Sequence, residues 1–156
     1  MKILVVSSEL PYPPHSGGGP LKLYHLLREL AADHEITLVA CAEQTVRAEW
    51  LDELTGLGLD VHLHTIRDDQ PSPYQDTPVV WQKYWSFEIL EKLSACMRAT
   101  AYDVIHLDMP PMARLCPFIT HTPCVFAPND SLTLNGRRIL KQTPMWQPRF
   151  VAACTR

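Results

Sequence analysis

Apolar and polar positions along the chain follow two different periods, which predict strands and helices in turn. Continuous apolar and β-branched runs predict strands that are covered on both faces, as in a parallel sheet. Apolar residues that recur every three or four positions predict helices. The expected strands are 2–8, 35–41, 60–66, 102–108 and a short buried one at 123–127; the expected helices lie around 23–30, 46–57, 87–97, within 109–121 and at 131–142.

The alternation of strands with helices predicts a Rossmann-like α/β domain. Right-handed crossovers bring successive strands into one parallel sheet with helices on both faces, and the expected strand order is 3-2-1-4-5. In such sheets ligands bind beyond the carboxyl ends of the first and fourth strands, where the winding direction reverses. This rule selects the loop 7–19, the pair His106 and Asp108, and, one strand further, Asn129 and Asp130.

Three consecutive glycines precede the first predicted helix. Proline accounts for 14 of the 156 residues, and its clusters fall where elements should end; the first cluster leads into Gly17, Gly18 and Gly19. We expect Gly19 to cap the helix and Pro20 to lie in its first turn. Glycine amides approach a phosphate closely, and a helix N-terminus adds partial positive charge. The pattern favours an anion site over a merely flexible turn.

The spacing of these glycines does not match a dinucleotide fingerprint. Counting G-x-G-x-x-G from Gly17 places Lys22 where the third glycine is needed, and the Gly-Lys-Ser/Thr of a P-loop is missing from the sequence. An oxidoreductase with an atypical cofactor loop is therefore the least favoured function. The net charge of −3 also excludes general electrostatic binding to nucleic acid, which requires clustered basic residues.

Polar residues near the predicted strand ends are candidates for binding or catalysis, each with a structural alternative. His106 and Asp108 share one strand face and could line an acceptor pocket, although a histidine in an apolar strand is more often a hydrogen-bonded structural residue. Asp130 could bind a hydroxyl group or act as a base, or it could cap the helix that follows. Both interpretations of Asp130 remain open.

The first loop and the third predicted strand supply further candidates. Glu9, Tyr12 and His15 could contact an acceptor, while Tyr12 could equally pack among the neighbouring prolines. His62 and His64 lie two residues apart, as a metal pair could. Because no third ligand is near them, a solvated strand face is favoured and no metal site is predicted.

Cysteine content and hydropathy predict a cytoplasmic protein. The five cysteines show no C-x-x-C spacing and are expected to be mostly small buried thiols in a reducing compartment. The N-terminus does not resemble a signal peptide, and no apolar run approaches the ~18 residues of a membrane span. An aromatic cluster is expected mainly in the core, with peripheral contact at the inner membrane face as the alternative; it comprises Trp81, Tyr84, Trp85 and Phe87.

Several segments in sequence order resemble a known family. They are the apolar strand 1–8, Pro-Tyr-Pro-Pro at 11–14, Ser-Gly-Gly-Gly at 16–19, the helix at 23–30, His-Glu-Ile-Thr-Leu-Val at 34–39 and Tyr-Asp-Val-Ile-His at 102–106. Together they are similar to the N-terminal part of family-4-type retaining glycosyltransferases of the GT-B fold. The resemblance extends to about residue 131.

The resemblance implies a two-domain enzyme in which the N-terminal Rossmann-like domain binds the acceptor. The C-terminal domain holds the nucleotide sugar, and transfer with retention needs no obligatory metal or other cofactor. Gly17, Gly18 and Gly19 match the loop that approaches the donor diphosphate, whose departing negative charge fixed amides can stabilise. Many relatives carry a histidine after the fifth strand, where this chain has Asn129 and Asp130, so these two are the candidate catalytic residues.

The chain length matches one of the two domains that the resemblance implies, at about 150 residues per domain. We expect residues 1–142 to form the acceptor-side domain and 143–156 a C-terminal tail, with the donor domain absent and little turnover by the chain alone. The implied partners are a nucleotide sugar, a glycan, lipid or small-molecule acceptor, and the missing domain. The alternative is a non-catalytic Rossmann-like module that binds a sugar or phosphate, or pairs with a separate donor-domain subunit.

Overall fold

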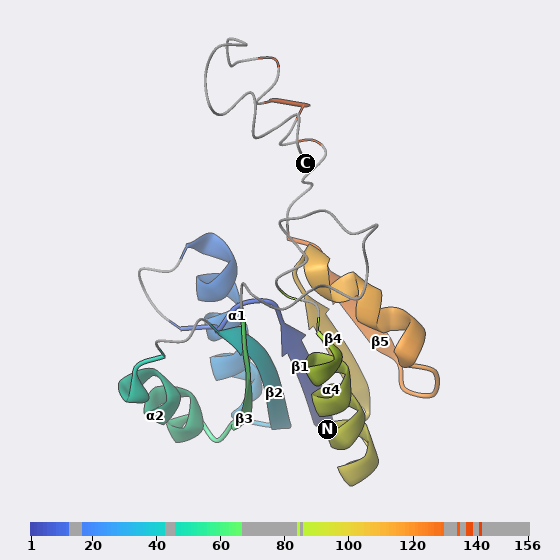
Figure 1. The fold of residues 1–156 in the computed structure, drawn as a ribbon. Coiled ribbons are helices and arrows are strands. Elements are labelled where there is room, and N and C mark those ends of the chain that lie inside the picture. The colour runs from blue at the N-terminus through green and yellow to red at the C-terminus, as the bar shows by residue number, and fades with distance from the viewer. Residues whose placement is uncertain are drawn as a thin grey trace.

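Five parallel strands form a single sheet in the order β3-β2-β1-β4-β5 (Figure 1). The computed structural model describes residues 1–12, 17–42, 46–66, 84, 86–129, 134, 137–138 and 141. Its elements are β1 Lys2–Ser7, α1 Gly18–Leu30, β2 Glu35–Ala42, α2 Ala48–Gly56, β3 Asp60–Thr65, α4 Phe87–Ala99, β4 Val104–Asp108, the 3-10 helix η1 Pro110–Phe118 and β5 Cys124–Ala127. The predicted Rossmann-like α/β class and strand order are confirmed.

Successive residues of β1 pack into two separate cores, one on each face of the sheet. Ile3 and Val5 belong to the core that α1 and α2 cover, whereas Leu4 and Val6 belong to the core that α4 and η1 cover. This follows from the alternation of side chains along a strand and explains the continuous apolar run of β1. The central strand β1 is therefore buried on both sides and holds the ends of its neighbours β2 and β4 in place.

The helices bury one face each, at positions that differ in detail from the predicted ones. In α1 the tyrosine Tyr24 donates a hydrogen bond of 2.7 Å to Glu53 Oε1 and so joins α1 to α2. This hydrogen bond, followed by burial, raises the pKa of Tyr24. In α4 the buried residues are Ile89, Leu93 and Cys96, while Phe87 is exposed. Of the expected helix at 131–142, the structure describes Leu134, Arg137, Arg138 and Lys141, which are all helical; its other residues, with Trp81 and Trp85, lie outside the described residues.

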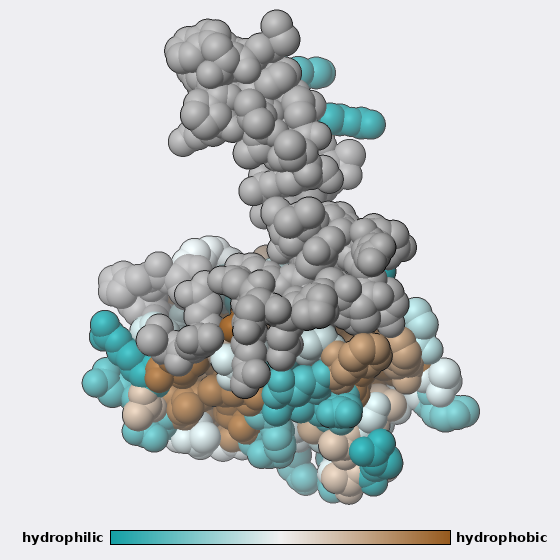
Figure 2. Space-filling model, in the orientation of Figure 1, coloured by the Kyte–Doolittle hydropathy of each residue, from teal (hydrophilic) through white to brown (hydrophobic). Residues whose placement is uncertain are grey.

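β5 is exposed, which corrects the prediction of a buried strand at 123–127. Val125 and Phe126 point to opposite faces of the sheet, yet they are 51% and 40% exposed. In the part of the chain that the structure describes, β5 is one edge of the sheet, opposite β3, and pairs with β4 alone. Phe118 adds apolar surface from η1, and apolar side chains gather over this side of the molecule in Figure 2.

Among the described residues, none of the helices is both long enough and apolar enough to cross a bilayer.

Candidate functional site

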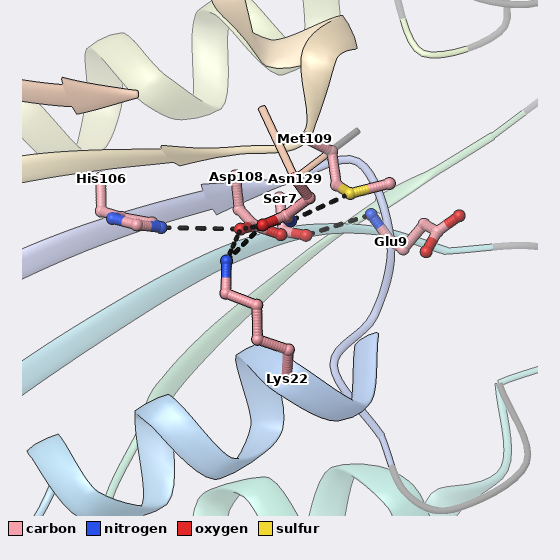
Figure 3. A network of polar contacts seen from close by, with 7 residues as sticks. All are labelled: Ser7, Glu9, Lys22, His106, Asp108, Met109 and Asn129. Carbon is pink, nitrogen blue, oxygen red and sulfur yellow. Dashed lines mark hydrogen bonds and ion pairs between the residues drawn. The ribbon is translucent and has the colours of Figure 1, made fainter. Parts of the chain in front are cut away.

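Polar side chains from two elements, β4 and α1, and from the segment that follows β5 meet at the carboxyl end of β4. Asp108, the last residue of β4, is 1% exposed, and its Oδ1 lies 3.8 Å from Lys22 Nζ of α1. The same Oδ1 accepts a hydrogen bond of 3.1 Å from Asn129 Nδ2, which follows β5. Lys22 Nζ in turn donates to Asn129 Oδ1, so the three side chains hold one another. With His106 they form what we call the Asp108 network (Figure 3).

The register of β4 explains why these polar residues share one side of the sheet. Val5 of β1 pairs with His106 and Ser7 pairs with Asp108, so both polar residues point toward the face that α1 covers. His106 Nε2 is buried and lies 3.6 Å from Asp108 Oδ1, and among the described residues it has no hydrogen-bond partner. The predicted juxtaposition of His106 and Asp108 on one face is confirmed. These two side chains give a polar, charged carboxyl end to a sheet face that is otherwise apolar.

The backbone at the Asp108 network contains two unusual conformations. Among the described non-glycine residues, positive φ occurs at Met109, with φ 76° and ψ 148°, and at Asn129, with φ 57°. Asparagine tolerates the left-handed region, whereas methionine at these angles costs about 1–3 kcal/mol. Asn129 Nδ2 donates to Met109 Sδ at 3.2 Å, so the two residues with positive φ are in contact. Strain of this kind concentrates at functional sites, where the surrounding structure enforces it.

The glycine loop ends in the first turn of α1, which begins earlier than predicted. Gly17, with φ 95°, is the N-cap residue, not Gly19, and Pro20 is the third helical position. Pro20 has no N–H group to offer, and the amide of Leu21 bonds to the carbonyl of Gly17 at 3.4 Å. The amides of Gly18 and Gly19 are therefore the first-turn donors that no helical carbonyl accepts. They could hold two oxygens of an anion at the positive end of the helix.

The three glycines differ in the space around them. Among the described residues, a Cβ at Gly17 or Gly18 would meet nothing within 4 Å, whereas a Cβ at Gly19 would lie 3.3 Å from Met109 Sδ. Gly19 therefore lets α1 pack closely against the residue that follows β4. With respect to the described part of the chain Gly18 faces open space, and this is where a ligand could reach the amides.

Replacing Gly17 with alanine should lower the free energy of unfolding by about 1–3 kcal/mol, because its φ of 95° strains any L side chain. Gly18→Ala, one residue further along, is the matched control and should change stability by no more than about 0.5 kcal/mol, because its side chain enters open space. Urea denaturation followed by circular dichroism measures both. Equal losses in the two variants would contradict the left-handed conformation at Gly17.

The predicted loop residues are only partly placed near the network. Glu9 follows the end of β1, where its backbone N–H donates to Ser7 Oγ at 3.2 Å. Its Oε2 lies 3.9 Å from the position that a Cβ on Gly19 would take. Tyr12 instead stacks on Trp50 of α2, with ring centroids 5.1 Å apart. His15 and Asp130 lie outside the described residues, so their predicted roles stay predictions.

Two residues of the candidate site are not predicted by the sequence motifs. The motifs single out Lys22 only as the position where the dinucleotide fingerprint fails, and Met109 only as the start of a short helical pattern. The available signal was the charge pair itself: a lysine early in the helix after the glycine loop and an aspartate ending the fourth strand. Because both positions adjoin the point where the winding reverses, the fold brings them together.

The predicted solvated face of β3 is confirmed at His62 and is wrong at His64. His62 is exposed and contacts Asp60 at 3.0 Å, but His64 is buried beneath the start of α4. His64 Nε2 is 3.2 Å from Ser86 Oγ, and Nδ1 is 3.7 Å from Glu88 Oε2. Within the described residues, no three His, Cys, Asp or Glu side chains are grouped so that they could hold a metal ion.

Comparisons with known proteins assign no family to the chain. No protein-family model, curated protein or solved structure matches the chain. The resemblance to the glycosyltransferase family therefore rests on the motifs of the sequence and stays a prediction.

Proposed function

We propose that this chain is the acceptor-side domain of a retaining glycosyltransferase, which moves a sugar from a nucleotide sugar to a glycan, lipid or small-molecule acceptor. One observation carries the proposal: the open amides of α1 and the Asp108 network adjoin at the carboxyl edge of the sheet. Such an arrangement offers an anion-binding cradle beside groups that bind hydroxyls. The confirmed strand order supports it, because ligands of these sheets bind at this edge.

On the donor side, the groups available are two amides and one ammonium. The amides of Gly18 and Gly19 would hold diphosphate oxygens, and the half-exposed Lys22 would add positive charge one turn further along α1. Asp108 and Asn129 hold the lysine in place, so its charge is oriented before a ligand arrives. Fixed donors of this kind stabilise the negative charge that develops on a departing nucleoside diphosphate.

On the acceptor side, β4 and β5 present a polar and an apolar side chain next to each other. His106 pairs in register with Val125, which is half exposed on the same face. An imidazole beside an apolar surface suits an acceptor that carries both hydroxyl groups and a hydrophobic part. Asn129 carries an amide that does not ionise near neutral pH, so we assign it to positioning and hydrogen bonding and not to proton transfer.

Binding of the diphosphate can be tested on the chain by NMR. Titration with uridine diphosphate, guanosine diphosphate or inorganic pyrophosphate should shift the amide signals of Gly18 and Gly19. Gly18→Val should weaken this binding about tenfold, equivalent to about 1.4 kcal/mol, because its side chain fills the open approach. Gly56→Val is the control, since Gly56 also faces open space but lies on α2. Equal affinities of the wild type and Gly18→Val would contradict the assignment.

Transfer can be tested with the protein encoded by the complete reading frame. It should convert labelled nucleotide sugars and hydroxyl acceptors into a glycoside with the anomeric configuration of the donor. Binding at Gly18 and Gly19 without any transfer across the acceptor panel would instead favour the non-catalytic sugar- or phosphate-binding module. An inverted product would contradict the retaining mechanism.

A further inference from the structure

Two exposed cysteines lie together where η1 ends and β5 begins. Cys116 is in the last turn of η1, Cys124 is the first residue of β5, and both thiols are free and exposed. The side chain of Cys116 hydrogen-bonds to that of Cys124. The prediction of buried thiols is therefore wrong for these two, while Cys41 and Cys96 are buried as predicted.

The backbone holds these two thiols on the same side of the sheet. Cys124 pairs in register with Ile105, whose side chain packs in the core that η1 covers. The turn between them is fixed at both ends, since Ile119 N donates to the Cys116 carbonyl at 3.0 Å and Ile105 N donates to the Pro123 carbonyl at 2.9 Å. Two thiols that interact across a short turn, with both ends of that turn held by backbone hydrogen bonds, are placed for a disulfide, which requires the two side chains to be close.

We propose that Cys116 and Cys124 form a reversible intramolecular disulfide by exchange with a low-molecular-weight disulfide of the glutathione type. The Cys116 thiolate attacks one sulfur of the oxidised glutathione, and the first glutathione leaves as a thiolate that takes up a proton. The Cys124 thiolate then attacks the Cys116 sulfur of this mixed disulfide and releases the second glutathione. The two cysteines lose two electrons and two protons, which the two glutathione thiols gain; reduced glutathione reverses the exchange.

The surroundings of the four described thiols separate an exposed pair from two buried thiols. Burial, followed by the charge and the hydrogen bond of Cys116, raises the pKa of Cys124 to about 11. Attack by either exposed thiol leads to the same disulfide, and the Cys124→Ser adduct tests the order that begins at Cys116. Once Cys116 is joined to glutathione, its sulfur carries no charge that opposes ionisation of Cys124. Burial raises the pKa of Cys41 to about 12, and burial is also the main cause that raises the pKa of Cys96. These two thiols should not compete.

The disulfide would join two segments that adjoin the Asp108 network. η1 directly follows Met109, which contacts Asn129, and β5 ends two residues before Asn129. A bond from Cys116 to Cys124 therefore closes the loop between these positions at the opposite end of β5. This modification site does not depend on the proposed transferase function.

The test is oxidation of the full chain in glutathione buffers of increasing oxidised fraction, followed by mass spectrometry and non-reducing peptide mapping. The wild type should lose two hydrogen atoms and yield one linked peptide pair that contains Cys116 and Cys124; dithiothreitol should restore both. Cys124→Ser should instead accumulate a mixed disulfide at Cys116, and Cys116→Ser should form no link. Cys154→Ser is the control and should form the link as the wild type does.

Three outcomes would overturn the proposal: a wild type that stays reduced, a wild type that stops at the mixed disulfide, or a link that maps to another cysteine. Circular dichroism of both serine variants shows whether they fold. Because both positions are exposed, their thermal unfolding should match that of the reduced wild type within a few degrees. The trapped glutathione adduct on Cys124→Ser is the readout that a merely structural contact would not give.

Discussion

Replacing Leu107 with alanine is expected to lower the free energy of unfolding by about 3–4 kcal/mol, as removal of a fully buried leucine does when its cavity does not collapse. Leu107 is completely buried in β4 and packs in the core between the sheet and the α4 and η1 layer. Its neighbours in the central strands have little freedom to fill the space, because they belong to a parallel sheet covered on both sides. Urea denaturation followed by circular dichroism measures the loss.

Val125→Ala is the matched control for this core substitution. Val125 lies on the adjoining strand β5 but is half exposed, so its truncation should cost no more than about 0.5 kcal/mol. A loss at Val125 close to that at Leu107 would show that another surface covers β5 in solution. It would contradict the exposed edge strand of the structure.

The layered fold could be predicted from the sequence because its signals are local. Apolar runs such as Ile3–Val6 mark strands that are buried on both faces, and the strict alternation with helices then leaves few topologies. The exposure of β5 could not be predicted in this way. The run at 124–127 is as apolar as a buried strand, and only its place at the edge of the described sheet leaves Val125 and Phe126 open.

The candidate site could be predicted in outline, because the rule that ligands bind where the winding direction of the sheet reverses depends on topology alone. It selected His106, Asp108 and Asn129, and the structure brings these three together. The same rule selects strand ends and the loops that follow them, so it leaves out Lys22, which lies within α1. The strained backbone of Met109 also has no local signal, because the ladder hydrogen bond of its N–H to Ala127 and the packing around it impose that conformation.

Replacing Asp108 with alanine is expected to lower the free energy of unfolding by about 2–4 kcal/mol and to weaken diphosphate binding. The substitution leaves Asn129 Nδ2 without its carboxylate acceptor and leaves Lys22 without its buried counter-charge. The half exposure of Lys22 reduces the cost below that of a fully buried pair, because water solvates the released ammonium. Urea denaturation gives the stability, and the NMR titration of Gly18 and Gly19 gives the affinity.

Two further substitutions separate the structural from the electrostatic role of Asp108. Asp103→Ala is the matched control, because Asp103 lies just before β4 and is exposed, so its loss should cost less than about 1 kcal/mol. Asp108→Asn keeps an oxygen that can accept from Asn129 but removes the charge that faces Lys22. It should recover most of the stability and leave the affinity for pyrophosphate weakened. If Asp108→Asn instead binds pyrophosphate as tightly as the wild type, the carboxylate does not position Lys22 for the anion and serves packing alone.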